Sequence, residues 1–209
     1  MADILLDTQG VPTAPAVGST LIYPNSNKRI TSTDENGLDL TLHPLYNANT
    51  ADVVANAADT YLTGSSIAIP SHLLQAGAIF RWRFGVTKSA AGVAAPIWVV
   101  RVGTLGTVVD AARLTFTQVA LQTAAVDAAF IDIDVVLRNI GAAGVLAGVL
   151  KMNHVLAATG FSTLTMNVLQ VTSAGFDTTT ASLIIGVSVN PGAAGVWTHQ
   201  VVTAQALGI

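Results

Sequence analysis

Two segments of the chain alternate strictly between apolar and polar residues, and this alternation limits the fold more than any other sequence feature. In residues 79–86 the apolar set is Phe80, Trp82, Phe84 and Val86. In residues 130–138 it is Ile131, Ile133, Val135 and Leu137. A period of two places alternate side chains on opposite faces of a strand, so each segment predicts a strand with one buried face.

Further strand patterns follow at regular intervals, separated by turns rich in Gly, Pro and Ala. They cover residues 61–69, 97–102, 113–117, 145–152, 163–171, 183–189 and 199–204. No window holds a helical period for more than about two turns. Short strands at this spacing are typical of an antiparallel sandwich or barrel. The prediction is an all-β fold, a two-sheet jelly-roll sandwich over residues 60–209.

The first fifty residues have a different pattern and predict an extended N-terminal arm with short β-hairpins. Short strands are expected at residues 20–23, 28–32 and 38–42, with turns at 24–27 and 34–37. Residues 46–59 are rich in Asn and Ala, and 51–59 is the predicted linker between this arm (1–50) and the body (60–209).

The arm has too little apolar area for a core of its own, yet it keeps several apolar residues. These are Leu5, Leu21, Ile22, Tyr23 and Ile30. Such a segment gains order by lying on another protein or by adding strands to an open sheet edge. These five residues are therefore the predicted attachment residues.

Charge is scarce and excludes several partners. Charged residues make up 10% of the chain, against roughly 25% in an average soluble protein. Nine basic and twelve acidic residues give a net charge of −3, which disfavours binding to nucleic acid. The longest apolar run, residues 140–150, is too short for a spanning helix, so no membrane association is expected. A surface with so little charge predicts burial against further copies of the chain.

Motifs that support catalysis or cofactor binding are missing from the sequence, so no enzyme activity, cofactor or metal is expected. Residues 103–107 are rich in glycine but lack the third glycine and the helix of a nucleotide site, and predict a turn. With no cysteine, thiolate metal sites and disulfides are excluded. The four histidines are too far apart in sequence for a local metal pair: His43, His72, His154 and His199.

Three aspartates, Asp127, Asp132 and Asp134, are the densest acidic group of the body. The last two share one strand face at roughly 7 Å, a spacing compatible with paired catalytic carboxylates or half a calcium site. The favoured interpretation is a solvent-facing row that pairs across strands with arginines, the candidates being Arg81, Arg83 and Arg138. The aromatic row of residues 80–84 likewise fits a sugar-stacking stripe, but core packing is the favoured interpretation.

Residues 61–110 resemble small virion proteins of tailed bacteriophages. The motifs that carry the resemblance are Ile69-Pro70, Leu74–Gly77, Phe80–Phe84, Thr87–Gly92 and Arg101–Thr104. Residues 122–127 and 131–137 continue it, and residues 12–37 are similar to segments that open phage fibre and head-attached proteins.

This resemblance implies a virion component built from a trimeric jelly roll, made in the host cytoplasm and located on the particle surface. The first hypothesis is a capsid decoration or head-fibre protein that docks through its arm on the major capsid protein or another virion protein. The alternative is a tail-fibre or receptor-binding protein that recognises host-surface glycans. A third class, a cupin-like or glycan-cleaving enzyme, is disfavoured because Glu35 is the only glutamate.

Overall fold

The computed structural model describes residues 21–24, 30–33, 39–41, 45–70, 74–164, 166–179 and 182–209. Side chains are described from Leu45 onward within these ranges, except those of Pro70 and Ser182. The chain divides into two compact units, residues 1–44 and residues 45–209. All regular elements in the described ranges are strands. No helix among these residues is long and apolar enough to cross a membrane.

The first unit contains a small antiparallel sheet in the order β1-β2-β3. Its strands are β1 (Leu21–Pro24), β2 (Ile30–Thr33) and β3 (Asp39–Thr41). The three short strands expected here are therefore present, each shifted by a residue or two. Pro24, expected in the first turn, instead pairs with Ile30 at the end of β1. The remaining residues of both expected turns lie outside the described ranges.

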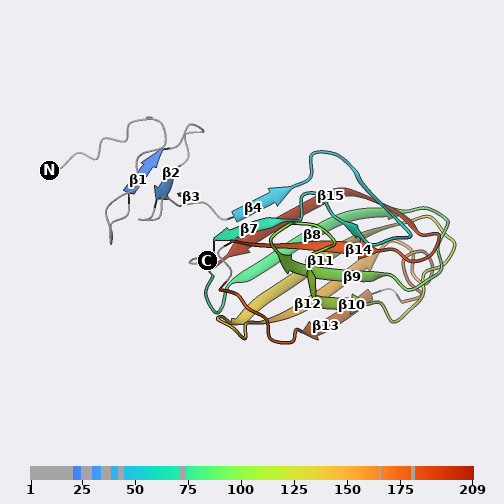
Figure 1. The fold of residues 1–209 in the computed structure, drawn as a ribbon. Helices are drawn as coiled ribbons and strands as arrows, with labels where there is room; N and C mark the ends of the chain where they lie inside the picture. Colours follow the sequence, from blue (N-terminus) through green and yellow to red (C-terminus); the bar gives the residue numbers. More distant parts are fainter. Residues whose placement is uncertain are drawn as a thin grey trace. The chain divides into compact units, whose positions relative to one another are not determined.

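The second unit, called the body below, consists of two antiparallel sheets (Figure 1). The large sheet has the order β13-β12-β11-β8-β15-β4, and β5 also pairs with β15. Its strands are β4 (Leu45–Ala48), β5 (Val53–Asn56), β8 (Ile79–Lys88), β11 (Asp127–Asn139), β12 (Val145–His154), β13 (Met166–Thr172) and β15 (Val196–Leu207). The small sheet has the order β10-β9-β14-β6, and β7 also pairs with β14. Its strands are β6 (Thr60–Tyr61), β7 (Ile67–Pro70), β9 (Ile97–Gly103), β10 (Ala111–Thr117) and β14 (Ser182–Asn190).

The strand pairs of the body are nested, as they are in a jelly roll. The outermost pair joins β4 and β5 to β15, and the next joins β6 and β7 to β14. Inside these lie the pairs β8–β11 and β9–β10, so that successive pairs alternate between the two sheets. The hairpin β12–β13 extends the large sheet beyond β11. The predicted all-β, two-sheet jelly-roll fold is confirmed.

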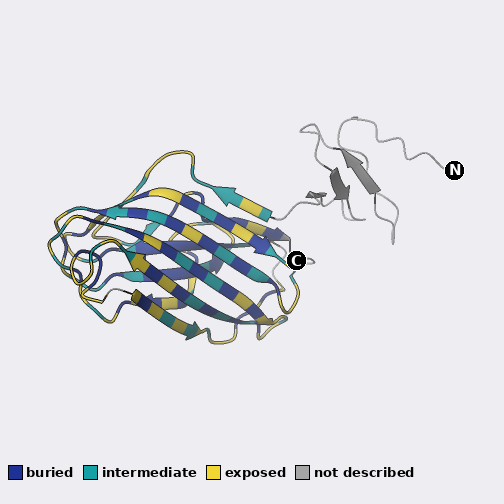
Figure 2. Cartoon of the chain, turned by 180° about the vertical axis from the view of Figure 1, so that it is seen from behind, coloured by how far each residue is buried: buried dark blue, intermediate teal, exposed yellow. Residues whose placement is uncertain are grey.

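The core lies between the two sheets and is built from the predicted alternation. Phe80, Trp82 and Phe84 of β8 are buried, whereas Arg83 between them is exposed. The banding along the strands in Figure 2 shows this alternation. Trp98, in β9 of the opposite sheet, packs against Phe84 with the ring centroids 5.2 Å apart. The expectation that the aromatic row of β8 is core is therefore confirmed.

The boundary between arm and body differs from the expected one. Residues 45–50 were assigned to the arm and 51–59 to a linker, but β4 and β5 both pair with β15 in the large sheet. Asn49, between these two strands, accepts a hydrogen bond from the Val202 amide through its side chain and donates one to the Val202 carbonyl through its backbone. Short edge strands fixed by an asparagine leave little apolar alternation in the sequence, which explains the different prediction.

The strand expected over residues 61–69 is interrupted between β6 and β7. In this gap the Ser65 hydroxyl accepts a hydrogen bond from the Val187 amide (3.0 Å) and donates one to the Val187 carbonyl (3.2 Å). The Ser65 hydroxyl thus replaces a backbone partner for the Val187 amide, whereas the Val187 carbonyl also accepts a hydrogen bond from the Leu62 amide (2.9 Å). The Ser65 carbonyl in turn accepts a hydrogen bond from Trp82 Nε1 (2.7 Å).

Candidate functional site

The two aspartates of β11 that were candidate carboxylates lie on the outer face of the large sheet. Asp134 stands opposite Arg81 in β8 and accepts a 2.6 Å hydrogen bond from Nε of that residue. Asp132 stands opposite Arg83, with Nε of Arg83 3.4 Å from its Oδ1. The hydrogen bond to Asp134 raises the pKa of Arg81 above its ordinary value. The predicted cross-strand pairing with Arg81 and Arg83 is confirmed, and this row has no acid–base arrangement.

The histidines do not converge in the described part of the chain. His199 is buried in the core, edge-on to Phe84 and Trp98, and burial lowers its pKa to about 4. His154 lies at the end of β12 against Asp127. His43 and His72 fall outside the described residues. No group of three or more His, Asp or Glu side chains that could hold a metal occurs among the residues described.

The glycine-rich turn after β9 is filled by a carboxylate from the chain itself. The Asp110 side chain accepts hydrogen bonds from the backbone amides of Leu105 (3.1 Å), Gly106 (2.6 Å) and Thr107 (3.3 Å). A group of convergent amides of this kind binds anions, and here the anion is Asp110. The prediction of a strand-to-strand turn is confirmed, and its amides have no room for a phosphate.

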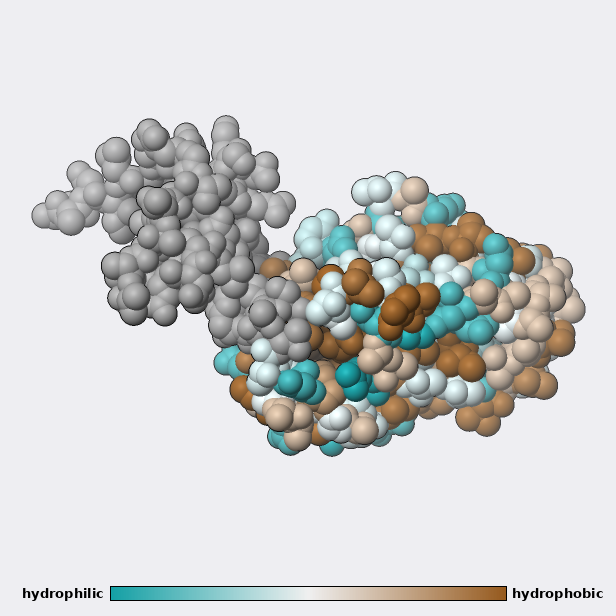
Figure 3. Space-filling view, viewed as in Figure 1, coloured by the Kyte–Doolittle hydropathy of each residue, from teal (hydrophilic) through white to brown (hydrophobic). Residues whose placement is uncertain are grey.

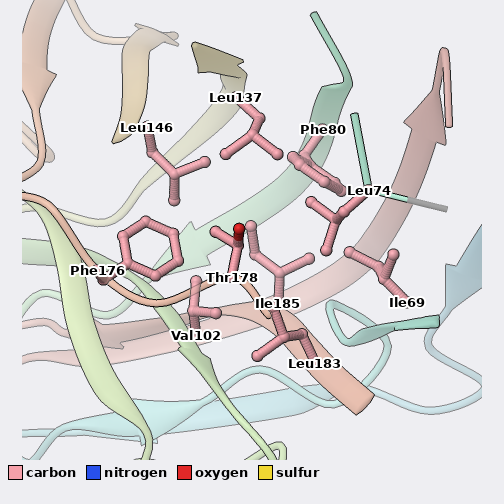
Figure 4. A pocket seen from close by; sticks show the side chains of 10 residues that line it. All are labelled: Ile69, Leu74, Phe80, Val102, Leu137, Leu146, Phe176, Thr178, Leu183 and Ile185. Carbon is pink, nitrogen blue, oxygen red and sulfur yellow. The ribbon is translucent and has the colours of Figure 1, made fainter. Parts of the chain in front are cut away.

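A pocket at the end of the sandwich opposite Lys88 is too small for a ligand. Phe80, Leu137, Phe176 and Ile185 line it, and Thr178 is the only polar side chain among the described lining residues (Figure 4). The Thr178 hydroxyl is already bonded to the Gly141 backbone. The volume open to a water-sized sphere is about 10 Å³, which is about one water molecule, whereas ligand sites hold roughly 300–1,000 Å³.

Beside the turn at residues 57–59, whose Asp59 pairs with Arg101, the other end of the body has four further loops, called the loop end below. They are residues 89–96, 118–126, 155–164 and 191–195, which follow β8, β10, β12 and β14. None of the four contains Asp, Glu, Lys or Arg. Three charged or titratable side chains, Lys88, Asp127 and His154, lie at the strand ends directly beneath these loops. Binding sites are disproportionately built from loops held by a rigid scaffold, so the loop end is the leading candidate.

Lys88 holds two of the loops through its buried ammonium group. Its Nζ donates to four backbone carbonyls, those of Ser89 (3.0 Å), Ala91 (3.2 Å), Thr123 (2.9 Å) and Ala125 (3.1 Å). Desolvation lowers the pKa of Lys88, and the nearby Asp127 charge opposes that shift. The hydrogen bonds fix loops 89–96 and 118–126 relative to each other.

Asp127 and His154 hold the third loop. His154 Nδ1 lies 2.8 Å from Asp127 Oδ2, and His154 Nε2 lies 2.7 Å from the Leu164 carbonyl. Asp127 also accepts hydrogen bonds from the amides of Leu156 (3.2 Å) and Phe161 (3.1 Å). This aspartate–histidine pair resembles part of a catalytic triad, but both nitrogens of the ring are occupied by structural partners. Its role is to anchor loop 155–164.

Gln122 joins the remaining loop to the others. Its Nε2 donates to the carbonyls of Ala94 (2.9 Å) and Pro191 (2.6 Å), and its Oε1 accepts from Trp197 Nε1 (2.9 Å). A Cβ on Gly92 would lie only 2.6 Å from the Cα of Gly195, so loops 89–96 and 191–195 touch through their backbones. Each loop of the set is therefore tied to a neighbour by a buried contact.

The surface of the loop end is almost wholly aliphatic. Its large exposed residues are Val93 (57% exposed), Val119 (82%), Leu121 (57%), Val126 (67%), Val155 (77%) and Leu164 (49%). Most other exposed positions of these loops are alanines. Figure 3 shows brown and tan residues gathered at this end of the body, on the right. A rigid aliphatic surface without charge suits binding to another protein, since sugar stacking needs aromatic rings and catalysis needs polar groups.

The predicted attachment residues lie in the first unit. Leu21, Ile22 and Tyr23 are in β1 and Ile30 is in β2, where they take part in the β1–β2 pairing. Leu5 falls outside the described residues. These residues belong to the first unit, whereas the loop end belongs to the second.

The residues that hold the loop end were partly visible in the sequence. Lys88 and Gln122 lie in turn motifs that carried the phage resemblance, but nothing there showed that they bond to distant carbonyls. Asp127 was grouped with Asp132 and Asp134, whereas the structure places it inside the body and the other two outside. The signal available in the sequence was the position of Lys88 and Asp127, charged residues that each border a long uncharged segment.

Comparison with known proteins gives no family. No protein-family model matches the chain, and no curated protein matches it. Among solved structures, it is similar to a lectin from Bauhinia forficata in complex with GalNAc, with 11% identity and a TM-score of 0.33, over 92% of this chain and 94% of the lectin.

Two further structures are similar. The CBM2 module of the evolved Dit of Lactobacillus casei BL23 phage J-1 has 8% identity and a TM-score of 0.27, over 79% of this chain and 98% of that one. A structure of infectious bursal disease virus, Gx strain, has 13% identity and a TM-score of 0.24, over 92% of this chain and 45% of that one. Likenesses this distant do not indicate what the chain binds.

Proposed function

We propose that the chain is a non-enzymatic structural protein of a tailed-bacteriophage virion, and specifically a trimeric capsid decoration or head-fibre protein. Its first unit docks on the major capsid protein or another virion protein, and its body stands on the particle surface. The observation that carries this proposal is the loop end, a rigid, uncharged, aliphatic surface fixed by buried polar side chains. Such a surface is built to contact protein.

Two further features support a structural role. Among the candidates for chemistry, Asp134, His154 and the glycine-rich turn each have structural partners. The phage resemblance of residues 61–110 covers motifs that now have structural roles, since the Thr87–Gly92 turn contains the carbonyls bound by Lys88. The scarcity of charge supports a trimer in which the aliphatic surface of the body is buried.

The division into two units supports attachment through the N-terminal one. The core of the body consists of residues from its own sheets, and Trp82, Phe84 and Ile133 in it are fully inaccessible to solvent. The first unit is left with three short strands and the apolar residues named above. Strands this short need a further surface for stability, and a virion protein would supply that surface.

A receptor-binding role is the second candidate, and one observation favours it. A row across the outer face of the large sheet places Tyr46 (65% exposed) opposite Gln205, which stands opposite Arg81 and its partner Asp134. An exposed aromatic ring beside an amide and an ion pair is the combination that binds sugar rings. In this case Tyr46→Ala would abolish glycan binding in a glycan-array assay and leave virion attachment unchanged.

The test of attachment uses the full chain and a variant lacking residues 1–44. Both are added to particles that lack the protein, and the bound fraction is measured by co-sedimentation. The full chain is expected to sediment with the particles. The truncated chain should stay in the supernatant while it keeps the circular dichroism and unfolding midpoint of a folded body. Equal binding by both would move the attachment surface to the body.

A further inference from the structure

Three of the four edges of the body sheets carry features that prevent pairing with another chain. An edge strand presents unpaired amides and carbonyls, which are a template for strand addition unless the edge is short, bulged or charged. One edge is split into β4 and β5, and another into β6 and β7. The third, β10, has a bulge between Ala112 and Leu114, with Arg113 at that point.

The fourth edge, β13, has none of these features. Its seven residues pair with β12 in continuous register, without a bulge. They include no proline and no charge, and the whole segment 155–176 is uncharged. No described strand pairs with the other side of β13. On its outer face Met166 is 61% exposed and Val168 is 58% exposed.

We infer that β13 pairs along this open edge with β13 of a second copy of the chain. The two strands run antiparallel about a two-fold axis through Leu169, which gives full overlap of residues 166–172. The described body of a second copy offers only one unprotected edge, so strand addition between two bodies uses β13 on both sides. Full overlap places Val168 opposite Gln170 of the partner subunit, and no like charges face each other.

The two-fold contact is independent of the trimer in the proposed function. A two-fold axis pairs copies in twos, so in a trimer it would join neighbouring trimers through their β13 strands. In a protein that forms no trimer, the same contact would give a dimer. In a dimer, or in a hexamer closed by two trimers, the loss of the contact halves the mass of the particle in solution, so the inference and the proposed trimer can fail separately.

The test measures particle mass by light scattering for the full chain and for the double variant V168K/Q170K. These outward-facing positions would place lysines opposite lysines across the two-fold axis, while the core side of the strand is unchanged. The particles formed by the variant are expected to have half the mass of those formed by the parent chain. The matched control is V136K/V201K, which adds the same charge at exposed valines of inner strands of the same sheet and should keep the parent mass.

A cross-linking experiment answers the same question without disrupting the contact. The chain has no cysteine, so V168C/Q170C introduces the only thiols. Directly opposite residues of antiparallel strands lie at Cα distances of roughly 4.5–5.5 Å, within disulfide reach, so oxidation should give a covalent dimer. Equal masses for parent and V168K/Q170K, or no covalent dimer, would overturn the inference. Protection of the β13 amides from hydrogen exchange that is equal in the parent and in V168K/Q170K would also overturn it, because the cover of this edge would then not be a second copy.

Discussion

Replacement of Lys88 by methionine tests how the loop end is held. Methionine keeps most of the apolar stem but removes the ammonium that bonds to the four carbonyls. Each buried carbonyl left without a partner costs about 1–3 kcal/mol, although loop carbonyls regain water as the loops relax. The buried Asp127 also loses its neighbouring positive charge. Together these losses should lower the free energy of unfolding by about 3–5 kcal/mol.

The assay is urea unfolding of the parent, Lys88→Met and the matched control Lys151→Met. Lys151 is exposed on β12, so the same substitution there should change stability by less than about 0.5 kcal/mol. In Lys88→Met, hydrogen exchange should rise in residues 89–96 and 118–126 before it rises in the core strands. A cost below about 1 kcal/mol, or equal costs at both lysines, would refute the view that this ammonium fixes the loops.

Three further predictions concern the core and the loop end. Trp82→Ala should lower the free energy of unfolding by about 3–5 kcal/mol because it leaves a cavity in the core. Arg81→Ala should lower it by less than about 1 kcal/mol. Equal shifts of the melting midpoint would contradict the assignment of Trp82 to the buried face of β8 and of Arg81 to its outer face. His199 has its pKa lowered from 6.5 to about 4, so the unfolded chain takes up a proton first as the pH falls. The stability from the neutral ring is therefore complete above about pH 6.5 and falls by roughly 3 kcal/mol towards pH 4; His199→Phe should flatten this part of the pH–stability curve relative to the parent. Gly160→Ala should lower the free energy of unfolding by at least about 2 kcal/mol, since φ of Gly160 is +79° and the new Cβ would clash with Asp127 Oδ2. In the control Gly77→Ala, φ is +94° and no atom lies within 4 Å of the new Cβ, so only the backbone strain should lower stability. Equal losses in the two variants would show that the contact with Asp127 does not contribute.

The inner strands of the body could be predicted from the sequence because a strand with one buried face has an apolar residue at every second position. Strands β8 and β11 lie in the middle of the large sheet, and every second residue of each is in the core. The same alternation predicted the arginine–aspartate pairs on the outer face, because residues opposite each other on neighbouring strands share a face.

The edge strands and the loop end could not be predicted in the same way. In β5 only Ala55 is fully buried, so hydrogen bonds to β15 determine its place and leave no apolar pattern. The carbonyls that Lys88 binds in residues 123 and 125 lie more than thirty positions away in the chain. Such contacts form only where the fold brings distant backbone groups close together, so the residue types alone do not predict them.

Under the proposed function a phage encodes this chain, and the most direct test of the central claim is the amount of the protein in purified virions of that phage. Quantitative mass spectrometry would compare the chain with the major capsid protein of the same particles. A capsid decoration or head-fibre protein should be present in a fixed ratio to the positions of the capsid lattice, and the ratio should be the same in tailless heads. Absence from the virion would contradict a structural role, and a few copies that disappear with the tail would replace the capsid assignment with a receptor-binding one.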